Sequence, residues 1–325
     1  MTELDKVSEE KIVISHRERV LKTLRGQELD RVARGEFFID AEFARAFLGV
    51  LGAIEFQHHQ AIVEELDLDV ASVSISGGWG ALEHPSEERA FDFLSRWRNE
   101  SDRFIFALID GPFSAAARAR GFEMLMHLVK STPPAAQAMF REGVEESLVV
   151  ARAVRDAGAE GVILGEDVAY GRTTYLSPND LRALYFPVLR DLVREIHALG
   201  LVVFFHSDGN LGSILNDIAA CEVDGVQGLE PGAGMNLRDA REHVGESVTL
   251  WGNLGFDFFS APRTSKEIDQ ALQSLVPSGT KNKLIWGSCS GLGQGMNPDT
   301  VRQVYRAMNP FCDVWRNSRG GLTEE

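Results

Sequence analysis

Two side chains able to bind a metal or move a proton, His206 and Asp208, stand at the end of the apolar run 201–205. Such a run, followed by polar residues and Gly209, predicts a buried strand that ends in a turn. Alternate residues of a strand share one face, so His206 and Asp208 would point the same way, about 7 Å apart along the strand. An imidazole beside a carboxylate can hold a divalent cation or transfer a proton. This stretch therefore predicts a catalytic or metal-binding site.

Other apolar runs of the chain also end in polar or reactive residues. The residues at these ends are Asp40, Ser76, Asp110, Glu166 with Asp167, Glu230, Asn253 and Cys289. His, acidic residues and Cys together are the usual zinc ligands. From this set we expect catalytic roles for His206, Asp208, Glu166 and Asp167, and metal binding by His206, Asp208, Glu230 and Cys289. For substrate binding we expect Phe38, Asp40, Trp79 and Asn253.

Each of these residues also has a structural interpretation. Asp208 before Gly209 could simply cap a turn, and the acids at the other strand ends could cap loops or helices. Cys289 could be a small buried side chain, because free cysteines are commonly buried. The aromatic residues could fill the core or plug the interior of a barrel. The site prediction therefore depends on whether the strand ends converge.

The elements that must position these residues alternate along the chain. Apolar runs without strict alternation are typical of parallel strands that are buried on both faces. A doubly wound open sheet is the competing fold, but no Gly-x-Gly-x-x-Gly follows the first predicted strand. We expect strands at 35–40, 69–75, 104–109, 161–165, 201–205, 225–230, 247–251 and 283–286. Helices are expected at 16–25, 41–48, 121–157 with a break at Pro133-Pro134, 178–199, 211–220, 265–275 and 298–308.

This order predicts the α/β class and a (β/α)8 TIM-type barrel with an N-terminal helical extension. Active sites of such barrels lie at the C-terminal ends of the strands, where the polar residues listed above stand. No linker-like segment interrupts the sequence, so we expect a single domain over residues 1–325. The ends, 1–12 and 317–325, are expected to be loose.

Composition excludes several classes of function. The 325 residues carry 33 basic and 48 acidic side chains, a net charge of −15, without a clustered basic stripe, so nucleic acid is not an expected partner. No run approaches the roughly 18 apolar residues that span a bilayer, and the N-terminus is not signal-like, which favours a cytoplasmic protein. The three cysteines lack paired spacing, which argues against a disulfide framework.

Several short motifs lie along the chain beside the predicted strand ends and helix starts. They are His206-Ser-Asp-Gly-Asn210, Pro231-Gly-Ala-Gly-Met235, Gly252-Asn-Leu-Gly255, Ser177-Pro-Asn-Asp-Leu181 after Gly165-Glu-Asp167, Arg17-Glu-Arg-Val20 and Asp30-Arg-Val32. Together these motifs resemble the uroporphyrinogen decarboxylase superfamily, which includes porphyrinogen decarboxylases and corrinoid-linked methyltransferases. The resemblance spans nearly the whole chain and implies a (β/α)8 barrel with its site in the mouth.

The chain departs from both branches of that superfamily. The decarboxylases carry Met-Arg-Gln-Ala-Gly-Arg near the first strand, where this chain has Glu36-Phe-Phe-Ile-Asp40; their second-strand aspartate corresponds to Ser76, and their late His-Gly to Ser290-Gly291. An acidic lining would repel a substrate with many carboxylates. The zinc methyltransferases have His-x-Cys on the fifth strand, where this chain reads His206-Ser-Asp208, and their later cysteine corresponds to Ser290.

The resemblance thus implies an enzyme of the methyltransferase-like branch, moving a methyl group from a small methylated substrate to a corrinoid protein. Zinc or another divalent metal is its expected cofactor, and relatives suggest a homodimer. Two alternatives stay open. One is a porphyrinogen decarboxylase of porphyrin biosynthesis, and the other is a catalytically silent barrel that binds a corrinoid or another ligand.

Overall fold

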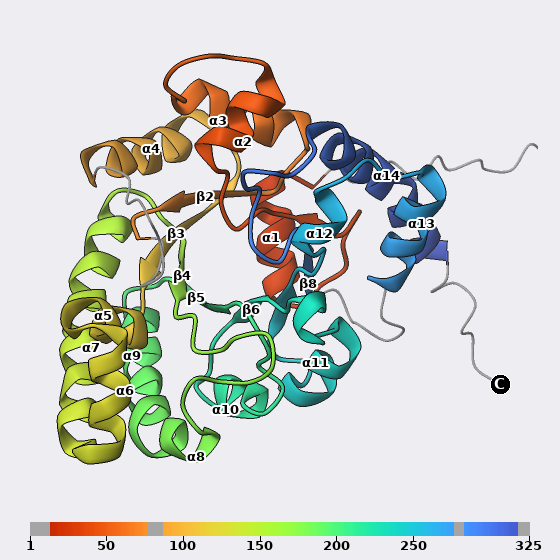
Figure 1. Ribbon diagram of the computed structural model, residues 1–325. Coiled ribbons are helices and arrows are strands. Elements are labelled where there is room, and N and C mark those ends of the chain that lie inside the picture. The colour runs from red at the N-terminus through yellow and green to blue at the C-terminus, as the bar shows by residue number, and fades with distance from the viewer. Residues whose placement is uncertain (1–13, 77–86, 276–282, 318–325) are drawn as a thin grey trace, which may run out of the picture.

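The computed structural model describes residues 14–76, 87–275 and 283–317, and their strands form one parallel eight-stranded sheet (Figure 1). Short apolar strands, each followed by a helical segment, curl the sheet into a (β/α)8 barrel, as the sequence predicts. The sheet order is β1-β8-β7-β6-β5-β4-β3-β2. The strands are β1 (Ala33–Arg34), β2 (Val70–Ser74), β3 (Phe104–Asp110), β4 (Gly161–Gly165), β5 (Val202–Ser207), β6 (Gly225–Gly228), β7 (Thr249–Trp251) and β8 (Leu284–Trp286).

Helices surround this sheet on its outer face (Figure 1). Those that begin before β4 are α1 (His16–Leu24), α2 (Ala41–Leu48), α3 (Phe56–Glu65), α4 (Glu87–Glu100), α5 (Pro112–Arg120), α6 (Phe122–Ser131) and α7 (Pro133–Asp156). The later ones are α8 (Pro178–Asp180), the π-helical η1 (Leu181–Tyr185), α9 (Phe186–Ala198), α10 (Leu215–Ala219), the 3-10 helix η2 (Pro231–Ala233), α11 (Leu237–Val244), α12 (Phe256–Phe259), α13 (Ser265–Ser274) and α14 (Pro298–Asn317). In the described residues, no helix is at once long enough and apolar enough to cross a membrane.

Side chains fill the lower barrel. An interior cluster includes Phe106, Phe204 and Trp251, whose rings lie 5.0 to 5.8 Å apart, so this part of the barrel is packed core. Gly35 leaves space for Trp251, because a Cβ at Gly35 would lie 2.8 Å from the indole. The site must therefore lie at the upper, C-terminal end of the strands.

The barrel closes differently at its first and last strand. β1 pairs with β8 in regular parallel register, but β1 and β2 are the two ends of the hydrogen-bonded order. Between them, the amide of Asp69 donates to the carbonyl of Arg34 at 2.8 Å, and the hydroxyl of Ser72 donates to the carbonyl of Glu36 at 2.9 Å. We call residues 34–36 and 69–74 the β1–β2 seam. These hydrogen bonds reach Ser72, the middle residue of β2, without forming a regular ladder.

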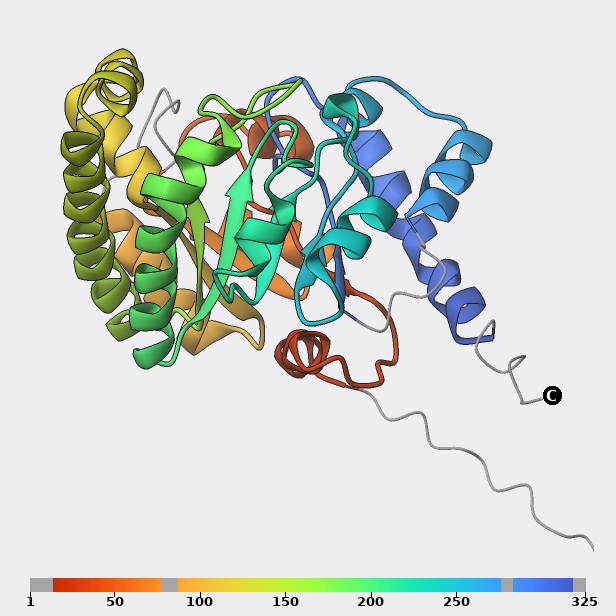
Figure 2. The same cartoon turned by 90° about the horizontal axis from the view of Figure 1, so that it is seen from below.

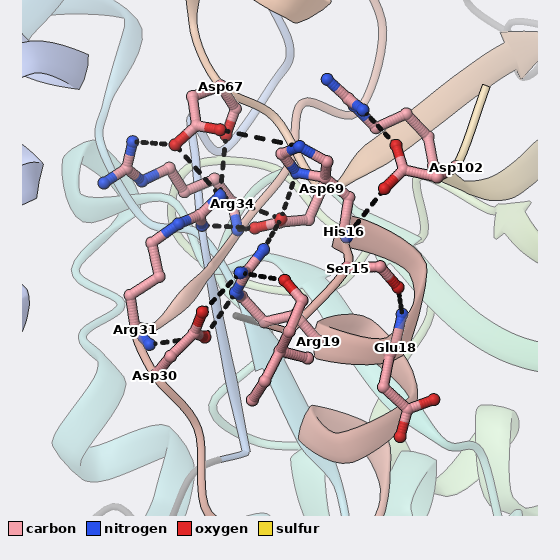
Figure 3. Close-up of polar contacts among 12 residues, drawn as sticks. Ser15, His16, Glu18, Arg19, Asp30, Arg31, Arg34, Asp67, Asp69 and Asp102 are labelled. Carbon is pink, nitrogen blue, oxygen red and sulfur yellow. Dashed lines mark hydrogen bonds and ion pairs between the residues drawn. The ribbon is translucent and has the colours of Figure 1, made fainter. Parts of the chain in front are cut away.

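The bottom of the barrel is covered by α1, which lies below the N-terminal ends of the strands (Figure 2). Beside it, cationic side chains converge on the buried carboxylate of Asp69 (Figure 3). Asp69 accepts hydrogen bonds from His16 Nδ1 at 2.8 Å and from Arg19 Nη1 at 2.6 Å. We call this group the basal ionic cluster; its members are His16, Arg19, Asp30, Arg31, Arg34, Asp67 and Asp69.

The sequence prediction misses or displaces some elements. Helices α3, α4, α5 and α11 were not expected, because their apolar faces are short and interrupted by charge. The first strand is expected at 35–40 but is Ala33–Arg34; farther along, Ile39 makes an isolated bridge to Leu292. The helical region expected at 121–157 breaks before Pro133, as predicted, and it starts just after Gly121, whose φ of +88° lies outside the helical range and separates α6 from α5.

Candidate active site

Three of the predicted residues come together at the mouth of the barrel. His206 is near the end of β5, Asp208 follows that strand, and Asp167 follows β4. One potential ligand atom from each lies within 4.8 Å of the other two. The Nε2 atom of His206 is 3.6 Å from Oδ1 of Asp167, and the same oxygen accepts the backbone amide of Asp208 at 3.2 Å. The expected convergence of strand ends is thus present for these three side chains.

The buried imidazole of His206 is held in one orientation. Its ring stacks on Phe37 with 3.9 Å between centroids, and its Nδ1 lies 2.5 Å from the amide oxygen of Gln227. The amide nitrogen of Gln227 donates to the carbonyls of Ser288 and Cys289 at 3.2 and 3.0 Å. Since the Gln227 oxygen can only accept, Nδ1 carries the hydrogen.

With its hydrogen on Nδ1, the neutral His206 ring directs the lone pair of Nε2 toward Asp167. A lone pair facing carboxylates is unfavourable until a cation or a proton lies among them. This arrangement is the one in which histidine binds metals, with the second nitrogen donating to an outer partner. The chemistry of the donor set therefore fits a divalent metal, with one nitrogen and two carboxylate ligands.

The backbone and charge around Asp167 are unusual. Its φ of +41° lies in the left-handed region that few non-glycine residues adopt. Burial raises the pKa of its carboxyl; the charge of His206 acts in the opposite direction, and that of Asp208 adds to the rise. A carboxyl held this way keeps its proton to a higher pH than an exposed aspartate does, and it can release that proton to an arriving cation.

The turn after β5 places Asp208. Gly209 has a φ of +84°, and a Cβ there would lie 2.7 Å from the backbone of Tyr170. The amide of Gly209 donates to Oε2 of Glu230 at 3.2 Å, and the hydroxyl of Ser290 donates to Oδ1 of Asp208 at 3.0 Å. The turn and the serine together hold the Asp208 carboxylate beside His206.

Glu166 lies behind the site. Its carboxylate is fully buried and accepts hydrogen bonds from the amides of Phe113 and Ser114 at 2.9 and 3.0 Å, and from the hydroxyl of Tyr185 at 2.6 Å. Burial raises its pKa to about 8, although these hydrogen bonds lower it. Gly111 leaves room for this carboxylate, because a Cβ there would overlap it. Glu166 thus joins β4 to the start of α5, next to the site.

The other predicted metal ligands have different partners. The group of three potential ligands contains neither Glu230 nor Cys289. Glu230 accepts the amide of Gly209, as described above. Cys289 is buried, with its sulfur 3.4 Å from the hydroxyl of Ser290, and burial raises the pKa of the thiol to about 11. A thiol with that pKa is a poor ligand until a cation displaces its proton.

The predicted substrate residues divide into two groups. Phe38 and Asp40 line a cavity of about 840 Å³, and the carboxylate of Asp40 also caps α2 by accepting the amides of Glu42 and Phe43 at 2.8 and 3.1 Å. Asn253 instead donates to the carbonyl of Leu229 at 3.0 Å and supports the loop after β6. Trp79 lies outside the described residues.

Sequence reasoning missed Gln227 as the orienting partner of His206. Gln227 pairs with His206 in the register between β5 and β6, which a single sequence does not reveal. The signal for Gln227 in the sequence was an amide side chain within an otherwise apolar strand, and the structure buries that amide fully. Buried amides require hydrogen-bond partners, so this one pointed to a polar neighbour.

The family of this chain follows from comparison with known proteins. Residues 88–311 match the model of the uroporphyrinogen decarboxylase (URO-D) family. The chain belongs to this family. The match covers α4 to α14 and includes all three residues of the proposed metal group.

Individual relatives are more distant. The chain is 29% identical over 124 residues to a uroporphyrinogen decarboxylase from Dichelobacter nodosus (strain VCS1703A), which is 38% of this chain and 34% of that protein. The match thus spans about a third of the length of that curated relative. A methyltransferase from Methanosarcina mazei has a TM-score of 0.76 at 18% identity, over 92% of this chain and 99% of that one. An L-ribulose 3-epimerase has a TM-score of 0.51 at 11% identity, over 91% and 99%. At these identities the structures show the shared fold.

Proposed function

We propose that this family member is a methyltransferase-like enzyme. It moves a methyl group from a small methylated substrate to a corrinoid that a partner protein carries. The observation that supports this proposal is the group of Asp167, His206 and Asp208, with Nε2 of His206 directed toward a carboxylate. The overall similarity to a methyltransferase is in keeping with it.

The three side chains of the proposed metal group suit the chemistry of methyl transfer. A methyl group that leaves without its bonding electrons makes the remaining heteroatom more basic, so that atom needs positive charge or a proton. A divalent cation such as Zn²⁺ would be held by Asp167, His206 and Asp208, and when bound it supplies Lewis-acid polarisation of the leaving atom.

The residues of the chain have separate tasks in this proposal. Gln227 keeps the Nε2 lone pair of His206 available, Phe37 keeps the ring in place, and Ser290 orients Asp208. When His206 is protonated, Nε2 also carries a hydrogen, which points toward Asp167. His206 can then give this proton to the leaving heteroatom as a general acid. Catalysis by such polarisation is typically worth several kcal/mol.

Decarboxylation of a porphyrinogen-like tetrapyrrole is the second candidate, and the family-model match favours it. The negative charge at the described part of the mouth argues against this second candidate. Asp167 and Asp208 stand where a substrate with many carboxylates would enter, and Arg118 of α5 already pairs with Asp110 at the end of β3. Burying carboxylates beside these acids would cost free energy through like-charge repulsion.

The test is metal analysis combined with a methyl-transfer assay. Purified protein reconstituted with Zn²⁺, Mn²⁺ or Co²⁺ is expected to hold one ion per chain. It is also expected to methylate free cob(I)alamin, followed by its absorption spectrum, from one of a panel of methylamines, methanol, methyl ethers and methyl thioethers. His206→Ala should lower metal affinity more than about 100-fold, beyond the effect of losing an outer partner.

His197→Ala is the matched control for this test. His197 forms a similar pair with Asp224 at 2.9 Å, but at the surface, behind the barrel wall. It should leave metal content and methyl transfer unchanged. A protein that binds none of the three ions and converts uroporphyrinogen would overturn the first proposal and support the second.

A further inference from the structure

The cavity of about 840 Å³ extends well beyond the mouth of the barrel. At one end it is lined by Glu36, Phe37 and Asp167, and therefore reaches the proposed metal group. At the other end it is lined by residues of α2, α3 and α4, which lie outside the sheet beside β2 (Figure 1). A cavity confined to the barrel would not contact these helices.

The lining residues of β2 show how the cavity leaves the barrel. Val70 belongs to the apolar cluster inside the barrel, whereas Val73 belongs to the cluster between the sheet and the helices, and both line the cavity. Successive strand residues point to opposite faces, so the cavity contacts both faces of β2. A single space can do so by passing around a side edge of the strand or over its end, and its contact with Val70, at the start of β2, favours the side edge.

That edge is at the β1–β2 seam. The other edge of β2 is paired with β3 along its whole length, from Val70 to Ser74. Across the seam, hydrogen bonds join Arg34 to Asp69 and Glu36 to Ser72. Residues 37–40 and 73–74, above these contacts, line the cavity from its two sides.

The lining indicates what kind of molecule fits. Most of it is apolar, with the aromatic side chains of Phe37, Phe38, Phe93 and Trp97. Glu36 and Asp167 lie at the inner end, while Arg45 and Arg89 lie at the outer end. Arg45 pairs with Glu42 and Arg89 with Glu55, so their charges are matched, whereas the acids at the inner end would repel an anion. A ligand of either charge would also lose its hydration among the apolar side chains. The volume is in the range of sites for small organic ligands.

We propose that the β1–β2 seam is a lateral passage, and that a small, uncharged, largely apolar molecule binds in it and reaches Asp167 without crossing the mouth. The passage itself does not depend on the reaction. Under the proposed function, a methyl donor enters and the demethylated product leaves through this passage while a corrinoid protein covers the mouth. Only this role of the passage rests on the proposed function.

The test uses N-phenyl-1-naphthylamine, a neutral apolar dye whose fluorescence rises on binding, with the full chain. Wild-type protein is expected to bind about one dye per chain. Ala90→Phe adds a ring to the outer half of the cavity and should weaken binding at least tenfold. Ala53→Trp narrows the outer end from an exposed position and should slow association of the dye severalfold in stopped flow.

The matched control is Ala138→Trp, at an exposed position of α7 outside the cavity lining, which should change neither affinity nor rate. Circular dichroism checks that each variant folds. If Ala90→Phe does not fold, the association rate of the dye with Ala53→Trp still tests the passage, because the side chain at position 53 lies at the surface. Unchanged affinity in a folded Ala90→Phe, or unchanged association in Ala53→Trp, would overturn the passage. Since the assay contains neither metal nor methyl donor, its result is independent of whether methyl transfer is found.

Discussion

The two ends of the barrel each contain buried carboxylates, but in opposite electrostatic settings. At the bottom, burial alone would raise the pKa of Asp69, but the hydrogen bond from His16 and the charges of Arg31 and Arg19 lower it overall. At the mouth, burial raises the pKa of Asp167 despite the charge of His206. Carboxylates already matched by cations stabilise the fold, whereas those held near other acids can receive a cation or a proton. This difference supports the proposal that the mouth is the reactive end.

The largest expected effect is on stability, at the bottom. Asp69→Ala should lower the free energy of unfolding by about 3–5 kcal/mol, because it leaves buried guanidinium groups without their shared carboxylate. Urea denaturation measures this. The control Glu100→Ala breaks the exposed pair with Arg96 and should cost less than about 1 kcal/mol. Metal affinity of the folded Asp69→Ala protein should be unchanged, and a loss there would contradict the division between the two ends.

The next effect concerns the orientation of His206. Gln227→Met keeps the volume but removes the acceptor for Nδ1, so the two ring tautomers become available and metal affinity should fall about 10–100-fold. Isothermal titration with Zn²⁺ measures it. Asn210→Ala is a useful comparison, since that amide donates to the carbonyl of Ala233 and does not touch His206. Equal losses in both variants would show that Gln227 acts on the loops in general.

A third prediction concerns pH and Glu36, which accepts hydrogen bonds from Ser288 and Tyr305. Burial raises its pKa from 4.5 to about 7. Between these values the unfolded chain loses the proton that the folded chain keeps. Stability should therefore fall as pH rises from 4.5 to 7, by up to about 1.4 kcal/mol per pH unit.

Glu36→Gln should flatten that slope in urea titrations at several pH values. The slope from Asp69 has the opposite sign, because its folded pKa is lowered, and its contribution is lost as pH falls below about 3.8. An unchanged slope between pH 4.5 and 7 in Glu36→Gln would show that other groups produce it.

The smallest expected effect is at Cys289. Because its thiol lies outside the group of three and has a raised pKa, Cys289→Ala should change metal affinity less than about twofold. Removal of the buried sulfur should cost about 1 kcal/mol of stability. A tenfold loss of Zn²⁺ affinity would restore Cys289 as the ligand that the sequence suggests.

The sequence predicts the barrel and the convergence of three proposed site residues at its mouth, for identifiable reasons. His206 and Asp208 share a strand face, and Asp167 follows the neighbouring strand, so local patterns and the geometry of parallel strands suffice. Gln227 requires the register between β5 and β6, which is a property of the folded sheet. Asp40 lines the cavity, but its bonds to the start of α2 depend on where the displaced first strand ends. The lateral cavity is still harder to predict from the sequence, because it depends on β1 and β2 not forming a regular ladder.

The manner in which the barrel closes also bears on how the chain folds. Arg34 and Asp69 are separated by 35 residues, whereas Glu36 and Ser288 are separated by 252. Bringing the more distant pair together costs about 2 kcal/mol more in chain entropy. The regular β1–β8 ladder joins the strands that are far apart in the sequence. Side chains and a single backbone hydrogen bond, from Asp69 to Arg34, join β1 to β2, which are close in the sequence. The strand pair that is easiest to bring together is therefore the one that can be left open for a ligand.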